Sequence, residues 1–224
     1  MQKLLTIKEV GDLLQVNQRT ILRMIQNDKI PATKIGNQWR FHPIHLEKWV
    51  LNGGVDANGG MENAWELEEE FQVFSPSRVL LDLNAASAAD ALRKMADHLA
   101  DEGHLLQRDI FYNALLEREK MSTTGVGRGV ALPHAWHPIN DLFRVPLVVA
   151  ARLKQAVDFQ AVDGLPVDLV FMLCSPRNRL HLKLLSAVNS IVREPFTLDL
   201  LRQAITPHEF VGVLTRMAPA IICG

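Results

Sequence analysis

Apolar positions in the first fifty residues recur at helical spacing, apart from one segment that alternates like a strand. A capping-box pattern at residues 6–9 precedes apolar positions at 10, 13 and 14, which predicts a helix. A second helix is expected through residues 20–25, with Asn17 as its N-cap. Residues 34–41 alternate around a Gly-Asn turn, which predicts a hairpin, and Pro43 suits the first turn of a third helix.

Apolar runs alternate with amphipathic stretches from residue 76 to the end of the chain. β-rich runs predict strands at residues 79–83, 145–152 and 167–174. Helical periodicity predicts five helices, at 88–103, 109–120, 180–193, 196–203 and 207–217. Strands interspersed with helices indicate an α/β (α+β) fold, a mixed β-sheet flanked by helices.

The segment between these two parts has a different composition. Residues 52–62 contain four glycines, and residues 51–77 contain six acidic residues and no basic one. Such a composition is typical of a flexible chain rather than a packed core. We therefore expect a first domain at residues 1–51, a flexible acidic linker at 52–75 and a second domain at 76–224.

Charge is distributed unevenly although the net charge is −1. Residues 1–50 carry eight basic and four acidic residues, a balance of +4, which suggests separate roles for the two ends. No apolar run reaches the roughly 18 residues of a membrane span, and no secretory signal is recognisable, so a cytoplasmic protein without membrane contact is expected. The two cysteines are interpreted as free thiols. No metal site or cofactor is predicted, and the pair His42 and His45 is not expected to bind a metal.

Residues 123–135, Thr-Thr-Gly-Val-Gly-Arg-Gly-Val-Ala-Leu-Pro-His-Ala, carry the candidate chemistry. They form a glycine-rich loop, a short apolar strand and a proline beside His134. Glycines allow backbone N–H groups to surround an anion, and a neutral imidazole nitrogen can attack a phosphoryl group. The predicted phosphate-binding residues are Thr123, Thr124, Gly125, Gly127 and Gly129. Alternatively, the stretch is only a flexible turn and His134 a surface histidine.

This run resembles the enzyme IIA proteins of the bacterial sugar phosphotransferase system, in their fructose, mannitol and nitrogen-regulatory branch. The resemblance covers residues 77–220 and implies that His134 carries the phosphoryl group. Arg118, in a Leu-Leu-Glu-Arg-Glu context, and His181, in His-Leu-Lys-Leu-Leu, match the family's other two active-site positions. The resemblance also implies a partner, the small histidine phosphocarrier protein of the system, which is itself charged from phosphoenolpyruvate. In the alternative, both residues have only structural roles: Arg118 lies on a helix surface and His181 caps its helix.

The first domain resembles the small winged helix-turn-helix module of excisionase type, distantly akin to the MerR regulators. Its matches are residues 5–10, 16–21, 30–41 and 46–49. Such modules insert the start of the second helix into the major groove. The resemblance implies that Gln18, Arg19, Thr20 and Arg23 contact DNA, with Lys34 and Arg40 on the wing. The alternative is a solvated basic face. Because the charge balance of +4 over residues 1–50 is modest, specific DNA binding would require a homodimer.

The sequence therefore predicts a nitrogen-regulatory-type IIA protein that accepts a phosphoryl group on His134 and regulates transcription through a DNA-binding domain. Two alternatives remain open. In one, a phosphocarrier acts only through protein–protein contacts and its first domain binds no specific DNA. In the other, the chain is a structural remnant through which no phosphoryl group passes.

Overall fold

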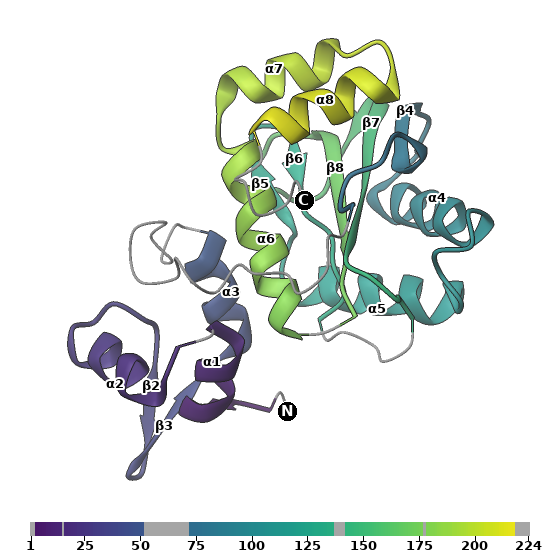
Figure 1. Cartoon of the computed structure of the whole chain (residues 1–224). Helices are drawn as coiled ribbons and strands as arrows, with labels where there is room; N and C mark the ends of the chain where they lie inside the picture. Colours follow the sequence, from purple (N-terminus) through teal and green to yellow (C-terminus); the bar gives the residue numbers. More distant parts are fainter. Residues whose placement is uncertain (1–2, 15, 52–71, 137–141, 177, 218–224) are drawn as a thin grey trace. The chain divides into compact units, whose positions relative to one another are not determined.

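The computed structural model describes residues 3–14, 16–51, 72–136, 142–176 and 178–217 (Figure 1). The chain separates into two compact units, residues 1–68 and 69–224, and each is described by itself. Most of the expected linker lies outside the described residues. Its last four residues, 72–75, are described and belong to the second unit, where the backbone N–H of Val148 donates to the carbonyl of Val73 at 3.1 Å.

The first unit is a three-stranded sheet with three helices. In chain order it contains β1 (Leu5–Thr6), α1 (Ile7–Leu14), α2 (Gln18–Gln26), β2 (Thr33–Ile35), β3 (Gln38–Phe41) and α3 (Pro43–Leu51). The strands are antiparallel in the order β1-β3-β2. Val10, Ile21 and Phe41 are fully buried and form the centre of this unit. The predicted helices and hairpin are confirmed, whereas the two-residue strand β1 was not predicted.

Side-chain caps fix where the first two helices begin. Glu9 accepts hydrogen bonds from the N–H and the hydroxyl of Thr6, and the N–H of Glu9 donates to that hydroxyl, which confirms the capping box. Asn17 is the N-cap of α2 and accepts from the N–H of Thr20 at 2.8 Å. The start of α2, and with it the exposed basic residues of its first turns, is therefore set locally by the sequence.

The second unit is a five-stranded mixed sheet. It contains the short 3₁₀ helix η1 (Pro76–Arg78), β4 (Val79–Leu83), α4 (Ala88–Asp101), α5 (Arg108–Met121), β5 (Gly125–Gly127), β6 (Val130–Ala131), β7 (Leu147–Val157) and β8 (Val167–Cys174), followed by α6 (Asn178–Val192), α7 (Pro195–Gln203) and α8 (Pro207–Met217). The strand order is β4-β7-β8-β6-β5. Strands β4 and β7 are parallel, as are β6 and β8, while β7 and β8 are antiparallel. The predicted mixed sheet flanked by helices is confirmed.

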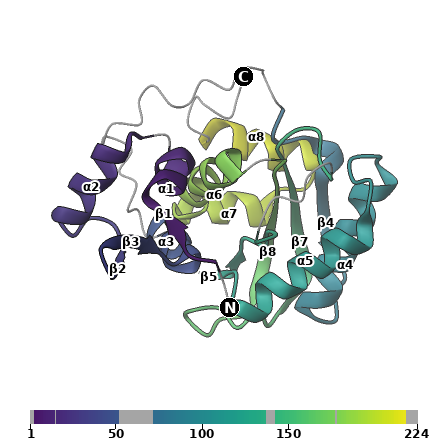
Figure 2. The same cartoon turned by 90° about the horizontal axis from the view of Figure 1, so that it is seen from below.

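Helices cover both faces of this sheet. Figures 1 and 2 show α4 and α5 on one face and α6, α7 and α8 on the other. Apart from Asp168, every residue of β8 is buried, as expected for a central strand covered on both faces. Among the residues that the structure describes, no helix is long and apolar enough to cross a membrane.

Candidate functional site

His134 lies just beyond the C-terminal end of β6, where the chain still runs beside β8. It follows β6 by three residues and forms an isolated parallel bridge with Leu173 of β8. The N–H of Leu173 donates to the carbonyl of Pro133 at 2.8 Å. Proline restricts the backbone, and the bridge attaches it to a central strand. The imidazole is therefore held on a rigid element, as the Pro-His motif predicted.

The two ring nitrogens of His134 have partners of opposite character. The Nδ1 atom lies 2.7 Å from the carbonyl oxygen of Leu132, which can only accept a hydrogen bond. The Nε2 atom lies 3.2 Å from the Nε of Arg118, which can only donate. These partners select the neutral tautomer with its proton on Nδ1. The lone pair of the imidazole is consequently on Nε2, on the side of the guanidinium.

Arg118 reaches His134 from the buried face of α5. It lies three residues after Leu115 and seven after Phe111, so the three side chains share one face of the helix. Its Nη1 donates to the carbonyl of Ser122 at 2.7 Å, and its guanidinium lies 5.8 Å from the ring centroid of Trp136. A buried arginine on an apolar face, held by a carbonyl and an aromatic ring, is preorganised to bind an anion.

His181 completes the group of three residues that the sequence predicted would lie together. It lies in the first turn of α6, and its ring centroid is 4.8 Å from that of His134, with the planes tilted by 57°. The positive end of the α6 dipole is therefore close to the imidazole of His134. Structure and sequence prediction agree on the grouping of Arg118, His134 and His181.

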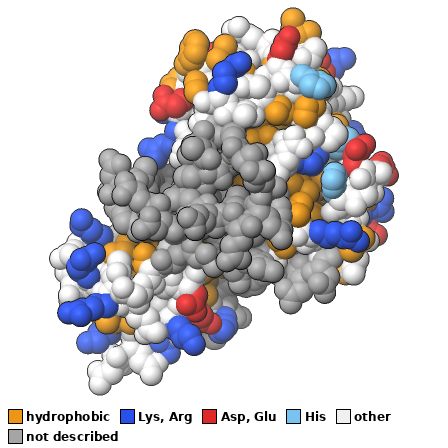
Figure 3. Space-filling model, viewed as in Figure 1, with side chains coloured by type: hydrophobic (Ala, Val, Ile, Leu, Met, Phe, Trp, Pro, Cys, Tyr) orange, Lys and Arg blue, Asp and Glu red, His pale blue; other side chains and the backbone are white. Residues whose placement is uncertain are grey.

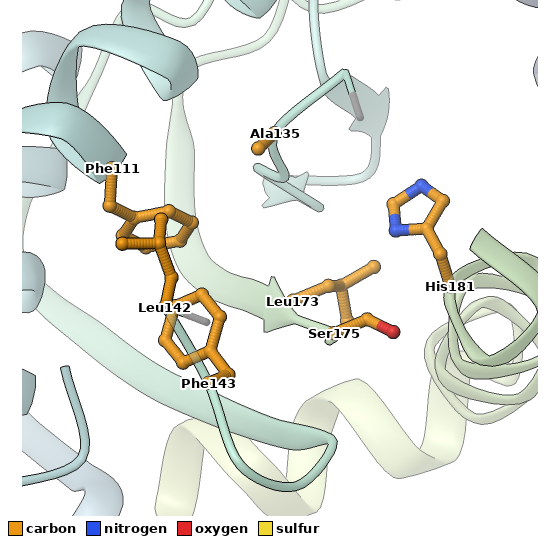
Figure 4. Close-up of a pocket in the computed structure, with 7 residues that line it drawn as sticks. All are labelled: Phe111, Ala135, Leu142, Phe143, Leu173, Ser175 and His181. Atoms are coloured by element: carbon orange, nitrogen blue, oxygen red, sulfur yellow. The ribbon is translucent and has the colours of Figure 1, made fainter. Parts of the chain in front are cut away.

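A small cavity adjoins this group. Figure 4 shows Phe111, Leu142 and Phe143 on one side of it and His181 on the other, with Ser175 between β8 and α6. Its volume of about 10 Å³ leaves room for no more than about one water molecule. This cavity is too small for a sugar.

Ser175 is a site residue that the sequence analysis did not select, although it directly follows β8. Its neighbour Cys174 is a free, buried thiol. Burial raises the pKa of the Cys174 thiol well above its usual value, and the nearby Arg78 offsets this effect only in part. Cys174 therefore remains protonated and is not a nucleophile of this site.

The threonines predicted to bind phosphate already have protein partners. Both the N–H and the hydroxyl of Thr124 donate to the carboxylate of Glu119, at 2.8 and 2.5 Å. The hydroxyl of Thr123 donates to the carbonyl of Phe159 and accepts from the N–H of Gly125. These groups fasten the chain between α5 and β5, and the expected cradle of free donors is not found at Thr123, Thr124 and Gly125.

The glycines of the run lie in a β-hairpin formed by β5 and β6. Gly127, Arg128 and Gly129 have φ values of +95°, +56° and +76°, which reverse the chain between β5 and β6. Gly129 precedes His134 by five residues of extended chain, roughly 16 Å at the rise of a strand. Gly127 and Gly129 therefore lie at the turn of the hairpin, away from His134, and their role in phosphate binding stays a prediction.

A second candidate site lies at the start of α2 in the first unit. Gln18, Arg19 and Arg23 are exposed, and Figure 3 shows Lys and Arg side chains gathered on the α2 side of this unit. Thr20 differs, because its hydroxyl donates to the Asn17 side chain at 3.1 Å. Thr20 therefore helps to cap α2, and the three exposed neighbours are better placed to contact DNA.

The two basic residues of the predicted wing lie on opposite faces of the hairpin. Lys34 pairs with Trp39 across the strands, and its ammonium lies 5.9 Å from the centroid of that ring. Arg40 is the next residue after Trp39, so its side chain is on the other face, where it donates to Gln38. One face of the hairpin therefore presents Lys34 and the other Arg40.

Comparison with known proteins supports the two-part organisation. Residues 72–217 match the family described as phosphoenolpyruvate-dependent sugar phosphotransferase system, EIIA 2, and residues 4–54 match a helix-turn-helix domain. The first match covers more than half of the chain. The second covers the unit that contains α1 and α2.

Individual relatives are similar to between half and two thirds of this chain. A nitrogen regulatory protein of Bradyrhizobium diazoefficiens is 35% identical over 143 residues, which are 62% of this chain and 90% of the relative. A fructose-specific EIIA component of Haloferax volcanii is 37% identical over 113 residues, 50% of this chain and 71% of the relative. The crystal structure of IIA-Ntr from Neisseria meningitidis is 28% identical with a TM-score of 0.58, and covers 63% of this chain and 96% of that one. The mannitol IIA structure from Escherichia coli, 22% identical with a TM-score of 0.56, covers 63% of this chain and 98% of that one and shows the shared fold.

Proposed function

The chain belongs to the EIIA 2 family of the phosphoenolpyruvate-dependent sugar phosphotransferase system, and we propose that it accepts a phosphoryl group on Nε2 of His134. The observation that carries this proposal is the pair of hydrogen bonds that selects the ring tautomer. The nucleophilic lone pair is on the nitrogen nearest the guanidinium of Arg118. That guanidinium can move its donors from the imidazole to the incoming phosphoryl oxygens.

The proposed donor is the small histidine phosphocarrier protein of the system. The Nε2 lone pair of His134 attacks the phosphorus, a new N–P bond forms, and the donor's N–P bond breaks with its electron pair returning to the donor imidazole. The proton on Nδ1 stays in place, so the phosphorylated ring of His134 gains positive charge. The Leu132 carbonyl stabilises this charge through the Nδ1–H bond. Positioning and charge neutralisation supply the catalysis.

The roles of the three grouped residues differ in this proposal. His134 is the phosphoryl acceptor, Arg118 neutralises the phosphoryl oxygens, and His181 donates a hydrogen bond to them from the first turn of α6. The backbone N–H groups of Thr124, Gly125 and Arg128 have no direct part in this proposal, because protein acceptors engage them.

The first unit is proposed to bind DNA. The protein would then act as a regulator and would work in the cytoplasm, where the DNA is. The helix-turn-helix match and the exposed Gln18, Arg19 and Arg23 at the start of α2 support this proposal. Residues 1–51 would form the DNA-binding domain and residues 76–224 the phosphoryl-accepting domain. Similarity to nitrogen regulatory proteins supports regulation in nitrogen metabolism. With a balance of +4 over residues 1–50, binding as a homodimer would neutralise more phosphates.

In vitro phosphorylation tests the acceptor. The protein is mixed with labelled phosphoenolpyruvate, the first enzyme of the system and the phosphocarrier protein, and acid-labile label is followed. His134→Ala should abolish the label, and His181→Ala should slow its appearance. His208→Ala, an exposed histidine on α8, is the matched control and should behave like the unchanged protein. A wild-type protein without label, beside a labelled IIA protein, would refute the proposal.

Selection from a random DNA pool tests the first unit separately. The account predicts an enriched sequence motif, and its loss in an Arg19→Ala, Arg23→Ala double variant. No enrichment would favour the alternative in which the protein acts only through protein–protein contacts. Labelling at His134 together with an absence of DNA binding would support that alternative directly.

A further inference from the structure

Two neighbouring residues of α5 are connected to His134 by hydrogen bonds, one directly and one through intervening residues. Arg118 donates directly to its Nε2 atom. Glu119 accepts from the N–H and hydroxyl of Thr124, the carbonyl of Thr124 accepts from the N–H of Leu132 at 3.0 Å, and the carbonyl of Leu132 lies 2.7 Å from Nδ1. The imidazole is therefore held between Arg118 on one side and a three-step hydrogen-bond chain from Glu119 on the other.

We propose that Glu119 is a positioning residue for phosphoryl acceptance at His134, an inference that rests on the proposed function. The segment that carries Leu132 is attached to α5 through Thr124, and Glu119 makes two of the hydrogen bonds of that attachment. A shift of this segment relative to α5 would change both the Arg118–His134 distance and the direction of the Leu132 carbonyl. One carboxylate thus controls the geometry at both ring nitrogens.

The same attachment sets the tautomer of the ring. The Leu132 carbonyl accepts from Nδ1 only while it points at that atom, and this bond favours the tautomer with the proton on Nδ1, which leaves the lone pair on Nε2. It also stabilises the positive charge that the ring gains when it is phosphorylated.

A purely electrostatic role of Glu119 would have the opposite sign. A carboxylate near an incoming phosphoryl group repels it, so removing that charge would speed phosphorylation. A positioning role predicts that removing the carboxylate slows phosphorylation. The direction of the rate change therefore separates the two explanations.

Glu119→Gln is the test variant, because the amide keeps the size of the side chain but can accept only through one atom. Its NH₂ group would face one of the two Thr124 donors. Glu117→Gln is the matched control: it removes the same charge from the same helix at an exposed position two residues earlier. We expect Glu119→Gln to label at least about tenfold more slowly, the factor for losing one hydrogen bond to a charged group, and Glu117→Gln to label at the wild-type rate. An equal or faster rate for Glu119→Gln would overturn the inference.

Nitrogen-15 NMR of the unphosphorylated ring gives a readout that loss of stability alone would not move. The wild type and Thr124→Ser should show His134 with its proton on Nδ1, because serine keeps both donors to Glu119. Glu119→Gln should show a mixture of tautomers at a temperature where circular dichroism finds it folded. An unchanged tautomer in folded Glu119→Gln would overturn the inference. This measurement needs no phosphoryl transfer, so an unlabelled wild type would refute the proposed function while the tautomer still decides the role of Glu119.

Discussion

Replacing Arg118 by methionine removes the guanidinium that donates to Nε2 of His134 but keeps much of the side chain's length on the buried face of α5. In the unphosphorylated protein this replacement also leaves the carbonyl of Ser122 without its donor at 2.7 Å. The main expected effect is on phosphoryl transfer, where negative charge arrives at the nitrogen that faces the guanidinium.

The size of the effect follows from this geometry. The oxygens of a phosphoryl group whose phosphorus is bonded to Nε2 would lie about 4 Å from the guanidinium, where each unit charge contributes about 4 kcal/mol at an effective dielectric of 20. Part of this attraction is already present when the donor protein docks. A loss of roughly 3–4 kcal/mol in the transition state corresponds to a rate reduction of about 10²- to 10³-fold.

Arg118→Lys separates charge from geometry. Lysine keeps the positive charge but cannot donate to both Nε2 and the Ser122 carbonyl in the fixed planar arrangement of arginine. We expect a reduction of about tenfold, the factor for one charge-assisted hydrogen bond. The assay is the initial rate of labelling from the phosphorylated carrier, with Arg216→Met, an exposed position on α8, as the control. If folded Arg118→Met labels within threefold of the wild type, Arg118 does not act on the phosphoryl group.

Three further predictions concern other parts of the chain. Gly129→Ala should lower thermal stability by about 1–3 kcal/mol, because φ is +76° and a Cβ would lie 2.5 Å from Oδ1 of Asp168; labelling of the folded protein should be unchanged, and an unaltered melting temperature would contradict the hairpin. A hydrogen bond from Lys3 and the N-terminal cap of α1 lower the pKa of Glu9 from 4.5 to about 2, so Glu9 stabilises α1 fully above pH 4.5 and less as pH falls toward 2. The ratio of the amide-exchange rates of α1 in Glu9→Gln and in the wild type, measured at equal pH, should therefore fall toward one as the pH is lowered from 5.5 to 3. A ratio that stays constant would refute the assignment. Arg19→Ala should weaken DNA binding and reduce the slope of log affinity against log salt by about 0.9 for each DNA phosphate that the variant no longer neutralises, whereas an unchanged slope would exclude a phosphate contact there.

Local signals in the sequence were sufficient for much of the fold. The capping box at Thr6 and Glu9 and the N-cap Asn17 depend on residues three positions apart, and both are found as predicted. Strand β8 was recognisable because an eight-residue run, apolar apart from Asp168, suits a strand buried on both faces. Features determined within one turn or one strand were therefore predictable.

The glycine-rich run shows what composition alone leaves open. Glycines allow both an anion-binding loop and a tight hairpin, and the choice depends on partners elsewhere in the chain. Asp163 accepts from the N–H of Arg128, and Glu119 accepts from Thr124. One pairing joins residues 35 positions apart and the other residues five positions apart, and both hold the run as a hairpin. Neither acceptor could be identified from spacing.

The opposite faces of Lys34 and Arg40 could have been predicted. A two-residue turn at Gly36-Asn37 pairs Ile35 with Gln38 and Lys34 with Trp39, and successive residues of a strand point to opposite faces. The docking of residues 72–75 was harder to foresee. Val73 and Phe74 are buried, but the acidic, glycine-rich composition before them dominated the prediction of a linker.

The central claim is that phosphorus bonds to Nε2 of His134. The most direct test is to phosphorylate nitrogen-15-labelled protein with the carrier system and to identify the phosphorylated nitrogen by phosphorus–nitrogen coupling in NMR spectra. The account predicts one phosphorylated histidine, His134, with phosphorus on Nε2 and the proton retained on Nδ1. Phosphorus on Nδ1, on His181, or on no histidine while a known IIA protein is labelled in parallel would contradict it.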